Sequence, residues 1–192
     1  MNHALIIQPE LKQATQITDQ RSPQDRLTEA CGLAQAIDLE IVHTEIITIA
    51  RPRAASLLGP GVVERIAATA EDLDYPLILI NASLTPVQHR NLERALSCKV
   101  IDRTALILEI FGARAESHAG RLQVELAALT FQKSRLVRSW THLERQRGGG
   151  GFLGGPGERQ LELDKRMLTD QIKQIKKELC EVKRTRTCLL YT

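Results

Sequence analysis

The sequence has very few aromatic residues, which make up 3% of its 192 positions. Proteins that bind single-stranded nucleic acid without sequence preference usually stack successive bases on several aromatic side chains. The glycine-rich segment described below holds a single aromatic residue, Phe152. We therefore expect any nucleic-acid binding by this chain to depend on shape and backbone contacts rather than on base stacking.

Familiar metal, redox and membrane patterns are missing as well. The 4 cysteines are dispersed without CxxC spacing, and the 5 histidines form no HExxH motif. These patterns predict no metal site and a reducing compartment. No apolar run reaches the roughly 18 residues of a membrane span, and the N-terminus lacks the layout of a signal peptide. We expect a soluble, cytoplasmic protein without a membrane span.

Glycine, by contrast, is concentrated in one segment, Arg147 to Gln160, where seven of the ten residues 148–157 are glycine. Such a segment costs much backbone entropy to order, so its use must lie in backbone access or reach. It is not a phosphate-binding P-loop, because Glu158-Arg159-Gln160 stands where that motif requires lysine and then a hydroxyl residue. A passive turn between two helices is the simpler alternative, although such turns usually contain far less glycine.

Aliphatic residues recur every seven positions on both sides of the glycines. Neither narrow seam could be buried by one helix alone, so the pattern predicts an antiparallel two-helix coiled-coil hairpin with residues 148–157 at its tip. Arms of about 28 residues would each extend roughly 40 Å, and Pro156-Gly157 marks the start of the second arm. The seam residues are Leu122, Leu126, Leu129, Leu136, Trp140 and Leu143 before the glycines, and Leu161, Leu168, Ile172, Ile175, Leu179 and Val182 after them.

Charge divides the chain into two parts. Residues 1–113 carry 10 basic and 14 acidic side chains, whereas residues 114–192 carry 16 and 9. The one-sided excess favours a polyanionic partner, most simply RNA, over an ordinary solvated face. The candidate RNA-binding residues are Arg147, Gly148, Gly149, Gly150, Gly151, Phe152, Leu153, Gly154, Gly155, Gly157, Arg159, Lys165, Arg166, Lys173, Lys176 and Lys177.

Residues 1–113 alternate between strand and helix patterns, which predicts an α/β fold with a small parallel four-stranded sheet and flanking helices. Thr85 is the expected N-cap of one helix, with Pro86 at its first position, and Glu116–Gly120 is the expected hinge into the hairpin. The candidate strands are Ala4–Ile7, Glu40–Ile49, Leu77–Ile80 and Lys99–Ile101, and the candidate helices are Arg26–Ile37, one opened by Gly59-Pro60-Gly61, one opened by Thr85-Pro86, and Thr104–Ala113.

Polar residues near the expected strand ends raise the question of a ligand site. Asn81, Asp102 and Arg103 lie where parallel sheets often bind ligands, and Gly59-Pro60-Gly61 offers a weak anion nest at a helix start. Both arrangements are also common as caps, structural ion pairs and helix-entry turns. Because the chain contains no complete nucleotide-binding motif, we interpret these residues as structural and predict no catalytic, cofactor-binding or metal-ligating residues.

Four ordered motifs carry a specific resemblance. TPVQHRNLERALSCKVIDR from Thr85, TALILEIFGARA from Thr104, GRLQVELAAL from Gly120 and RGGGGFLGGPGERQLELDKR from Arg147 closely resemble the N-terminal half of HflX-type GTPases, bacterial translational GTPases that associate with the ribosome. The resemblance extends from about Arg26 to about Arg186. It implies an α/β domain over residues 1–113, a coiled-coil hairpin over 114–187 with loop 148–157, and a truncated start of the G domain, beginning as a strand, over 188–192.

The resemblance also implies partners. Proteins of this type bind the large (50S) ribosomal subunit, direct the glycine-rich loop toward its peptidyl-transferase region, contact 23S rRNA, and help to split stalled or idle ribosomes during stress. GTP and Mg²⁺ would be bound by the G domain of the full-length protein. Because this chain has no P-loop, we expect no GTP hydrolysis by the chain itself, which we interpret as a monomeric fragment or truncated product.

Two departures from the family pattern limit what can be transferred. Leu58-Gly59-Pro60-Gly61-Val62 stands where relatives commonly have a lysine-containing glycine loop. Phe152 and Leu153 stand where relatives often carry a small residue and an arginine, so a base contact by that arginine is not carried over. Two alternatives to ribosome binding remain open: a homodimeric coiled-coil scaffold, and a small nucleotide-binding α/β domain. Solution mass would test the first, and calorimetry with ATP and GTP the second.

Overall fold

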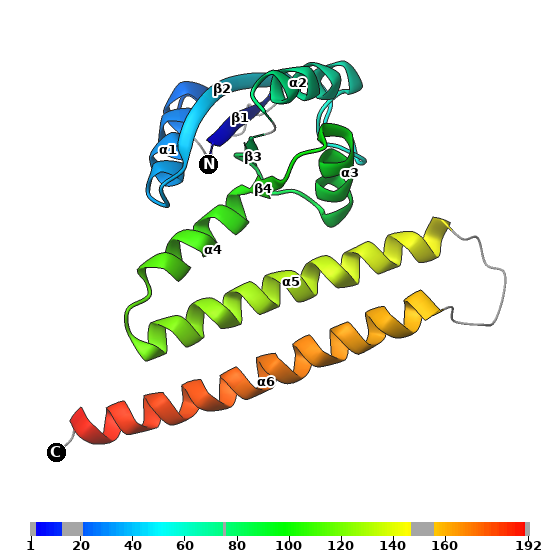
Figure 1. The fold of residues 1–192 in the computed structure, drawn as a ribbon. Coiled ribbons are helices and arrows are strands. Elements are labelled where there is room, and N and C mark those ends of the chain that lie inside the picture. Colours follow the sequence, from blue (N-terminus) through cyan, green and yellow to red (C-terminus); the bar gives the residue numbers. More distant parts are fainter. Residues whose placement is uncertain (1–2, 13–20, 75, 147–155, 191–192) are drawn as a thin grey trace. The chain divides into compact units, whose positions relative to one another are not determined.

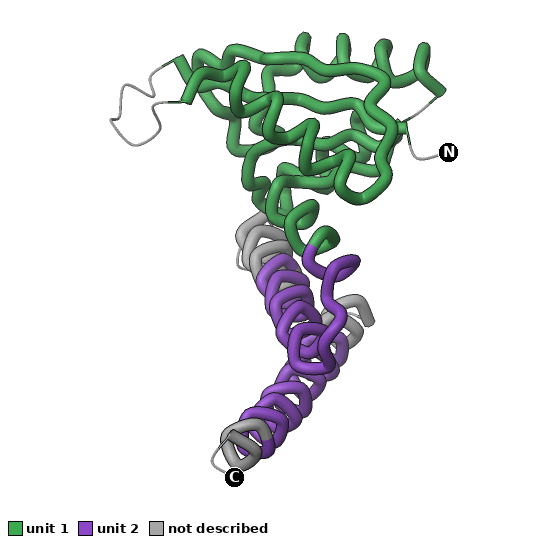
Figure 2. The backbone as a smooth tube through the Cα atoms, turned by 90° about the vertical axis from the view of Figure 1, so that its left-hand side faces the viewer, with its two compact units in different colours: residues 1–110 green, residues 111–192 purple. Residues whose placement is uncertain are grey.

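The computed structural model describes residues 3–12, 21–74, 76–146 and 156–190, with backbone alone for 136–146, 156–161 and 186–190. The chain divides into two compact units, residues 1–110 and 111–192 (Figure 2). Within the described residues, no helix is both long enough and apolar enough to cross a lipid bilayer.

The first unit is built on a four-stranded sheet of β1 (His3–Leu11), β2 (Glu40–Ile49), β3 (Leu77–Ile80) and β4 (Val100–Asp102). The strand order is β2-β1-β3-β4, and every neighbouring pair is parallel (Figure 1). The predicted parallel four-stranded sheet is therefore confirmed. The first strand is longer than predicted, because β1 continues to pair with β2 as far as Leu11 opposite Ile49, across polar residues that end the apolar pattern.

Four helices cover the two faces of this sheet: α1 (Pro23–Gln35) and α4 (Arg103–Arg114) on one face, α2 (Pro60–Asp72) and α3 (Pro86–Leu96) on the other (Figure 1). Three successive residues of β1 show why both faces are needed. Leu5 and Ile7 pack with the α2 and α3 side, whereas Ile6 packs with the α1 and α4 side. Side chains alternate across a strand, so a run of three buried aliphatic residues requires cover on both faces.

Side-chain caps fix where two of these helices begin. Thr85 Oγ accepts a hydrogen bond from the Gln88 backbone at 3.2 Å, and the Gln88 side chain accepts one from the Thr85 backbone. The predicted N-cap at Thr85 is thus confirmed, as a reciprocal capping box. Ser22 and Asp25 form the same arrangement before α1. That helix begins at Pro23 and not at the predicted Arg26, because the cap adds a polar first turn that hydrophobic spacing does not reveal.

The second unit consists mainly of two long helices, α5 (His118–Gln146) and α6 (Pro156–Leu190). Gly120 donates its backbone N–H to Ser117 Oγ at 3.0 Å, so α5 already begins at His118, and the predicted hinge over 116–120 is too long. The predicted start of α6 at Pro156 is confirmed. The strand expected from Cys188 is wrong for residues 188–190, which continue α6 because neither glycine nor proline interrupts the helix there.

Candidate nucleic-acid interface

A narrow aliphatic seam joins α5 to α6. Leu122, near the start of α5, is buried with Ile175 and Leu179 from the second half of α6. The beginning of one helix therefore meets the later part of the other, and the two run side by side in opposite directions (Figure 1). Leu126, Leu129 and Val182 pack against the same cluster, as the seven-residue repeat predicts.

The remaining parts of the predicted hairpin are not described. The side chains of Leu136, Trp140, Leu143 and Leu161 lie outside the described side chains, and residues 147–155 lie outside the described backbone. A coiled-coil hairpin with a glycine-rich tip therefore stays a prediction. What the structure gives is an antiparallel pair of helices whose shared contact covers one side of each, leaving the other sides of α6 exposed.

Basic side chains gather on one of those exposed sides. Successive gaps of seven, four and seven residues separate Arg166, Lys173, Lys177 and Arg184, which places them on a single face of a helix with 3.6 residues per turn. Lys165, Lys176 and Lys183 lie on the flank between that face and the seam. We call these residues the basic stripe, and all of its members are exposed: Lys165, Arg166, Lys173, Lys176, Lys177, Lys183 and Arg184.

Acidic residues of α6 border the basic stripe. Asp170 follows Arg166 by four residues, the spacing of neighbours on one helix face, and Glu181 stands in the same relation to Lys177. Glu178 lies farther round the helix. Lys173 Nζ lies 3.1 Å from Asp170 Oδ1, with both side chains well exposed. An exposed pair of this kind contributes about 0–1 kcal/mol, so it would not prevent Lys173 from contacting a phosphate.

Five of the predicted RNA-binding residues can be located with their side chains: Lys165, Arg166, Lys173, Lys176 and Lys177, all on the basic stripe. Gly157 lies in the first turn of α6, and the Arg159 side chain is outside the described side chains. The other predicted residues, 147–155, are also outside the described part. Lys183 and Arg184 extend the same stripe, and helical periodicity alone would have added them to the predicted set.

The sequence reading also missed an aromatic contact on α5. The Arg135 guanidinium carbon lies 4.5 Å from the centroid of the Phe131 ring, within the range of a cation–π contact. The two residues are four positions apart, the spacing at which side chains on a helix meet. Aromatic residues are scarce in the sequence, and the spacing of four residues between Phe131 and Arg135 was the available signal for this contact.

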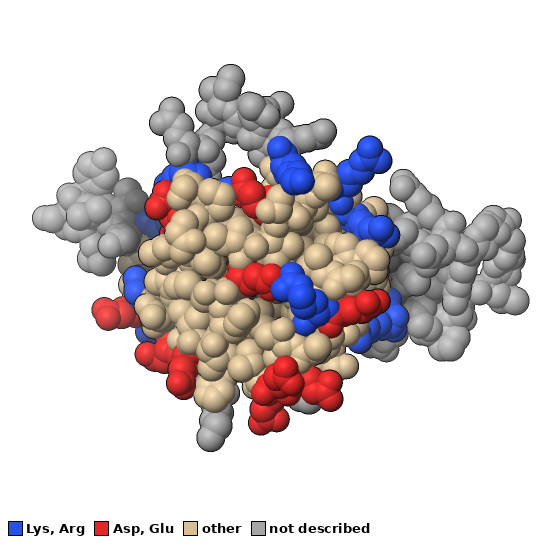
Figure 3. All heavy atoms as spheres, turned by 90° about the horizontal axis from the view of Figure 1, so that it is seen from above, with Lys and Arg blue, Asp and Glu red and all other residues tan. Residues whose placement is uncertain are grey.

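The polar residues at the carboxyl edge of the sheet hold the first unit together. Asn81 Nδ2 donates to Gln8 Oε1 at 2.6 Å, and Arg103 donates to Asn81 Oδ1 at 2.9 Å and to Glu29 Oε1 at 2.7 Å. Asp102 Oδ1 accepts from the Ala105 backbone at 2.8 Å and so caps α4. These contacts agree with the interpretation of Asn81, Asp102 and Arg103 as caps and structural pairs. Figure 3 shows acidic and basic side chains side by side on one face of this unit.

Comparison with known proteins identifies the class to which this architecture belongs. The protein-family model "GTP-binding GTPase N-terminal" matches residues 24–112, and the protein-family model "GTP-binding GTPase Middle Region" matches residues 114–190. The GTPase HflX of Magnetococcus marinus is 51% identical over 160 residues, covering 83% of this chain and 37% of that protein. The GTPase HflX of Escherichia coli is 49% identical over 144 residues, covering 74% and 34%. The chain belongs to the HflX family of GTPases and corresponds to its N-terminal and middle regions.

Solved structures show the same fold. The complex of SsGBP with GDP superposes with a TM-score of 0.67 at 19% identity, covering 97% of this chain and 46% of that one. A GTP-binding protein of the archaeon Sulfolobus solfataricus in complex with GDP gives a TM-score of 0.56 at 19% identity, covering 92% and 46%. The chain spans 37% and 34% of the lengths of the two HflX relatives named above.

Proposed function

We propose that this chain is the ribosome-binding N-terminal region of an HflX-like translational GTPase and that it binds the large (50S) ribosomal subunit through 23S rRNA. Joined to a GTPase domain that binds GTP and Mg²⁺, it helps to split stalled or idle ribosomes during stress in the cytoplasm. In this proposal the chain acts as a monomer, with an α/β domain over residues 1–113 and a binding hairpin over 114–187.

The observation that carries the proposal is the basic stripe on α6, whose seven lysine and arginine side chains are all exposed. Arg166 and Arg184 are 18 residues apart on one helix face, so the basic stripe extends over about 27 Å. Regularly spaced cations along a helix suit the regularly spaced phosphates of a nucleic-acid backbone. The seam lies on another side of the helix, so α6 can pack on α5 and contact RNA at the same time.

The glycine-rich segment has a separate part in the proposal. Residues 148–157 would reach into a narrow, RNA-lined space in which larger side chains would clash, and Arg147 and Arg159 would contact phosphates on either side of it. Replacing Gly149, Gly150 and Gly151 with bulky residues should weaken binding to the 50S subunit and leave the fold intact. Unchanged affinity would remove the loop from the mechanism.

Co-sedimentation with 50S subunits at increasing salt tests the role of the basic stripe. Each phosphate contact contributes about 0.7–0.9 to the slope of log K against log salt. The variant Arg166→Gln/Lys173→Gln/Lys177→Gln/Arg184→Gln should therefore bind more weakly at low salt and lower the slope by up to about 3.

The matched control removes acidic charge from the same helix. The variant Asp170→Asn/Glu178→Gln/Glu181→Gln changes a similar number of exposed α6 residues and should bind as tightly as the parent chain or more tightly, because it removes repulsion from phosphates. Circular dichroism should show unchanged helix content in both variants. Binding that ignores ionic strength, or equal weakening by both variants, would contradict phosphate recognition by the basic stripe.

A further inference from the structure

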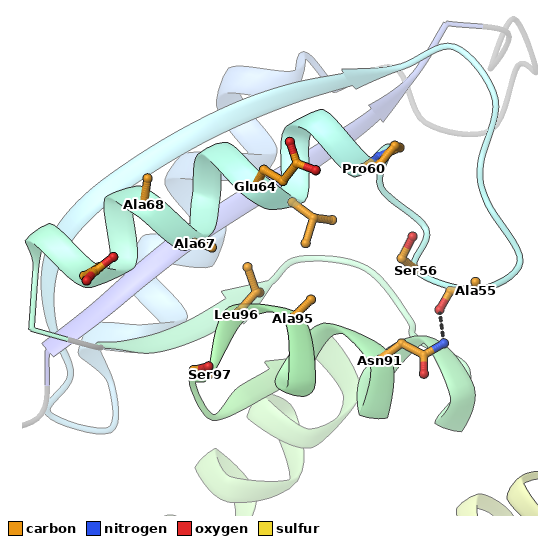
Figure 4. A pocket seen from close by; sticks show the side chains of 12 residues that line it. Ala55, Ser56, Pro60, Glu64, Ala67, Ala68, Asn91, Ala95, Leu96 and Ser97 are labelled. Carbon is orange, nitrogen blue, oxygen red and sulfur yellow. Dashed lines mark hydrogen bonds between the residues drawn. The ribbon is translucent and has the colours of Figure 1, made fainter.

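An open groove of about 660 Å³ lies between α2 and α3 in the first unit (Figure 4). Small side chains line much of it, including Ala67 and Ala68 from α2 and Ala95 from α3. Ala55 and Ser56, from the segment before α2, close one end, where the Asn91 side chain donates to the Ala55 carbonyl at 2.9 Å. That hydrogen bond fixes the end of the groove, so its shape is part of the fold.

The charged residues in the lining are two carboxylates, Glu64 and Glu71, both exposed on α2. Neither forms an ion pair or a hydrogen bond with another side chain in the described part of the chain. Elsewhere on the same helix, Arg65 is paired with Glu45 across to β2. The two carboxylates of the groove therefore have no basic partner among the described residues, whereas Arg65 on the same helix has an acidic one.

The position of Glu71 makes its charge unfavourable for the isolated chain. Glu71 and Asp72 end α2, and the last turn of this helix contains no basic residue. The carbonyl end of a helix carries a partial negative charge, so an acidic side chain there is unfavourable. A bound cation would reduce this repulsion. Binding of a cation would therefore account for an acidic residue at this position, whereas the stability of the isolated chain does not.

The groove is independent of the proposed ribosome-binding function, and its geometry points to a helical occupant. Glu64 and Glu71 are seven residues apart, which is about 10.5 Å along the helix axis. Lysine or arginine side chains seven residues apart on a second helix have the same separation. The alanines of the lining would allow that helix to approach closely, as small residues do at helix–helix contacts.

We propose that the groove between α2 and α3 docks a basic amphipathic helix of a partner protein. Its lysine or arginine side chains at positions i and i+7 pair with Glu64 and Glu71, and small residues between them rest on Ala67 and Ala95. Helix α6 of a second copy fits less well. An acidic side chain would face the groove within two of its i, i+7 pairs, because Asp170 lies between Arg166 and Lys173, and Glu181 between Lys177 and Arg184. The third pair, Lys176 and Lys183, borders the seam with α5, where Leu179 is buried.

An NMR titration of the full chain with a designed helix tests this inference. The probe is a stapled alanine-based peptide with lysines at positions i and i+7 on one face, and the comparison peptide has glutamates at those positions. Backbone signals of Ala67, Ala68 and Ala95 should shift saturably with the lysine peptide and remain in place with the glutamate peptide. The variant Glu64→Lys/Glu71→Lys should weaken binding at least tenfold.

Two further variants separate charge from shape. Glu109→Lys, the same type of charge reversal at one exposed site on α4 outside the groove, should leave binding unchanged. Ala95→Trp, which fills the groove while retaining both carboxylates, should weaken binding as much as the double charge reversal does. The proposal is overturned if the lysine peptide causes no shifts in α2 and α3, if spermidine reproduces the same shifts at equal affinity, or if the chain dimerises through this groove.

Discussion

The two units of the chain bury aliphatic side chains in different ways. In the first unit, the sheet is covered on both faces, so that consecutive residues such as Leu5, Ile6 and Ile7 are almost fully buried. In the second unit, residues such as Ile175 and Leu179 are buried only where α6 meets α5. Two-sided burial leaves few positions free of a structural role, whereas a narrow seam leaves most of a helix surface available to a partner.

Charged residues follow the same division. In the first unit, Arg103 lies 2.7 Å from Glu29, and Arg26 is paired with Glu10, so cations there link elements of the fold. On α6, the seven cations of the basic stripe are exposed along the helix, with Asp170 and Glu181 beside them. The same residue types thus link elements of the fold in one unit and form an exposed stripe in the other.

Truncating a buried side chain of the sheet should have the largest effect on stability. Ile80 on β3 is fully buried, and Ile80→Ala removes most of its side chain from a core covered on both faces. We expect the free energy of unfolding of the first unit to fall by about 2–5 kcal/mol, as measured by urea denaturation. Thr48→Ala, at an exposed position on the edge strand β2, is the control and should change it little. A loss below 1 kcal/mol for Ile80→Ala would contradict tight two-sided packing.

Truncating a buried side chain of the seam between α5 and α6 should have a smaller effect on stability. Ile175→Ala removes a buried side chain from the contact between α5 and α6, but alanine favours helix and the narrow seam can relax around the change. We expect a loss of about 1–2 kcal/mol, visible as a lower midpoint in thermal unfolding followed by circular dichroism at 222 nm. Lys176→Ala, the exposed neighbour, should leave the midpoint unchanged. If Ile175→Ala cost as much as Ile80→Ala, the contrast between the two units would fail.

Local patterns predicted much of this fold because they report directly on burial and on helix starts. The continuous aliphatic run Leu77–Ile80 predicted β3 with its observed bounds, and Thr85-Pro86 predicted the start of α3. Patterns failed where polar contacts decide a boundary. β1 extends past Gln8 because ladder pairing with β2 continues there, and α1 starts early because Ser22 and Asp25 cap each other.

The candidate site was predictable only in part, for a related reason. Composition revealed the basic excess after residue 113, but it did not show that seven of these cations are exposed along adjoining sides of α6. That arrangement follows once the segment is known to be one continuous helix. The partners of Asn81 could not be predicted at all, since Gln8 and Arg103 are 73 and 22 residues away in the chain.

The smallest expected effect concerns pH and the cap of α1. The Ser22 hydroxyl donates to Asp25 Oδ2 at 2.7 Å, and this hydrogen bond, with a second from the Ser22 backbone, holds the pKa of Asp25 below its ordinary value of 3.8. A pKa that is lower in the folded state stabilises the fold above the unfolded pKa, and this contribution is lost as pH falls through the folded pKa. In Ser22→Ala, the pKa of Asp25 should rise toward 3.8, as followed by NMR titration of the carboxyl carbon. The difference in stability between the parent chain and Ser22→Ala should then narrow on acidification below that value.

The control is Thr28→Ala, a change on the exposed side of α1, in which the pKa of Asp25 should remain as in the parent chain. An unchanged pKa in Ser22→Ala would show that the hydroxyl is not the cause of the shift.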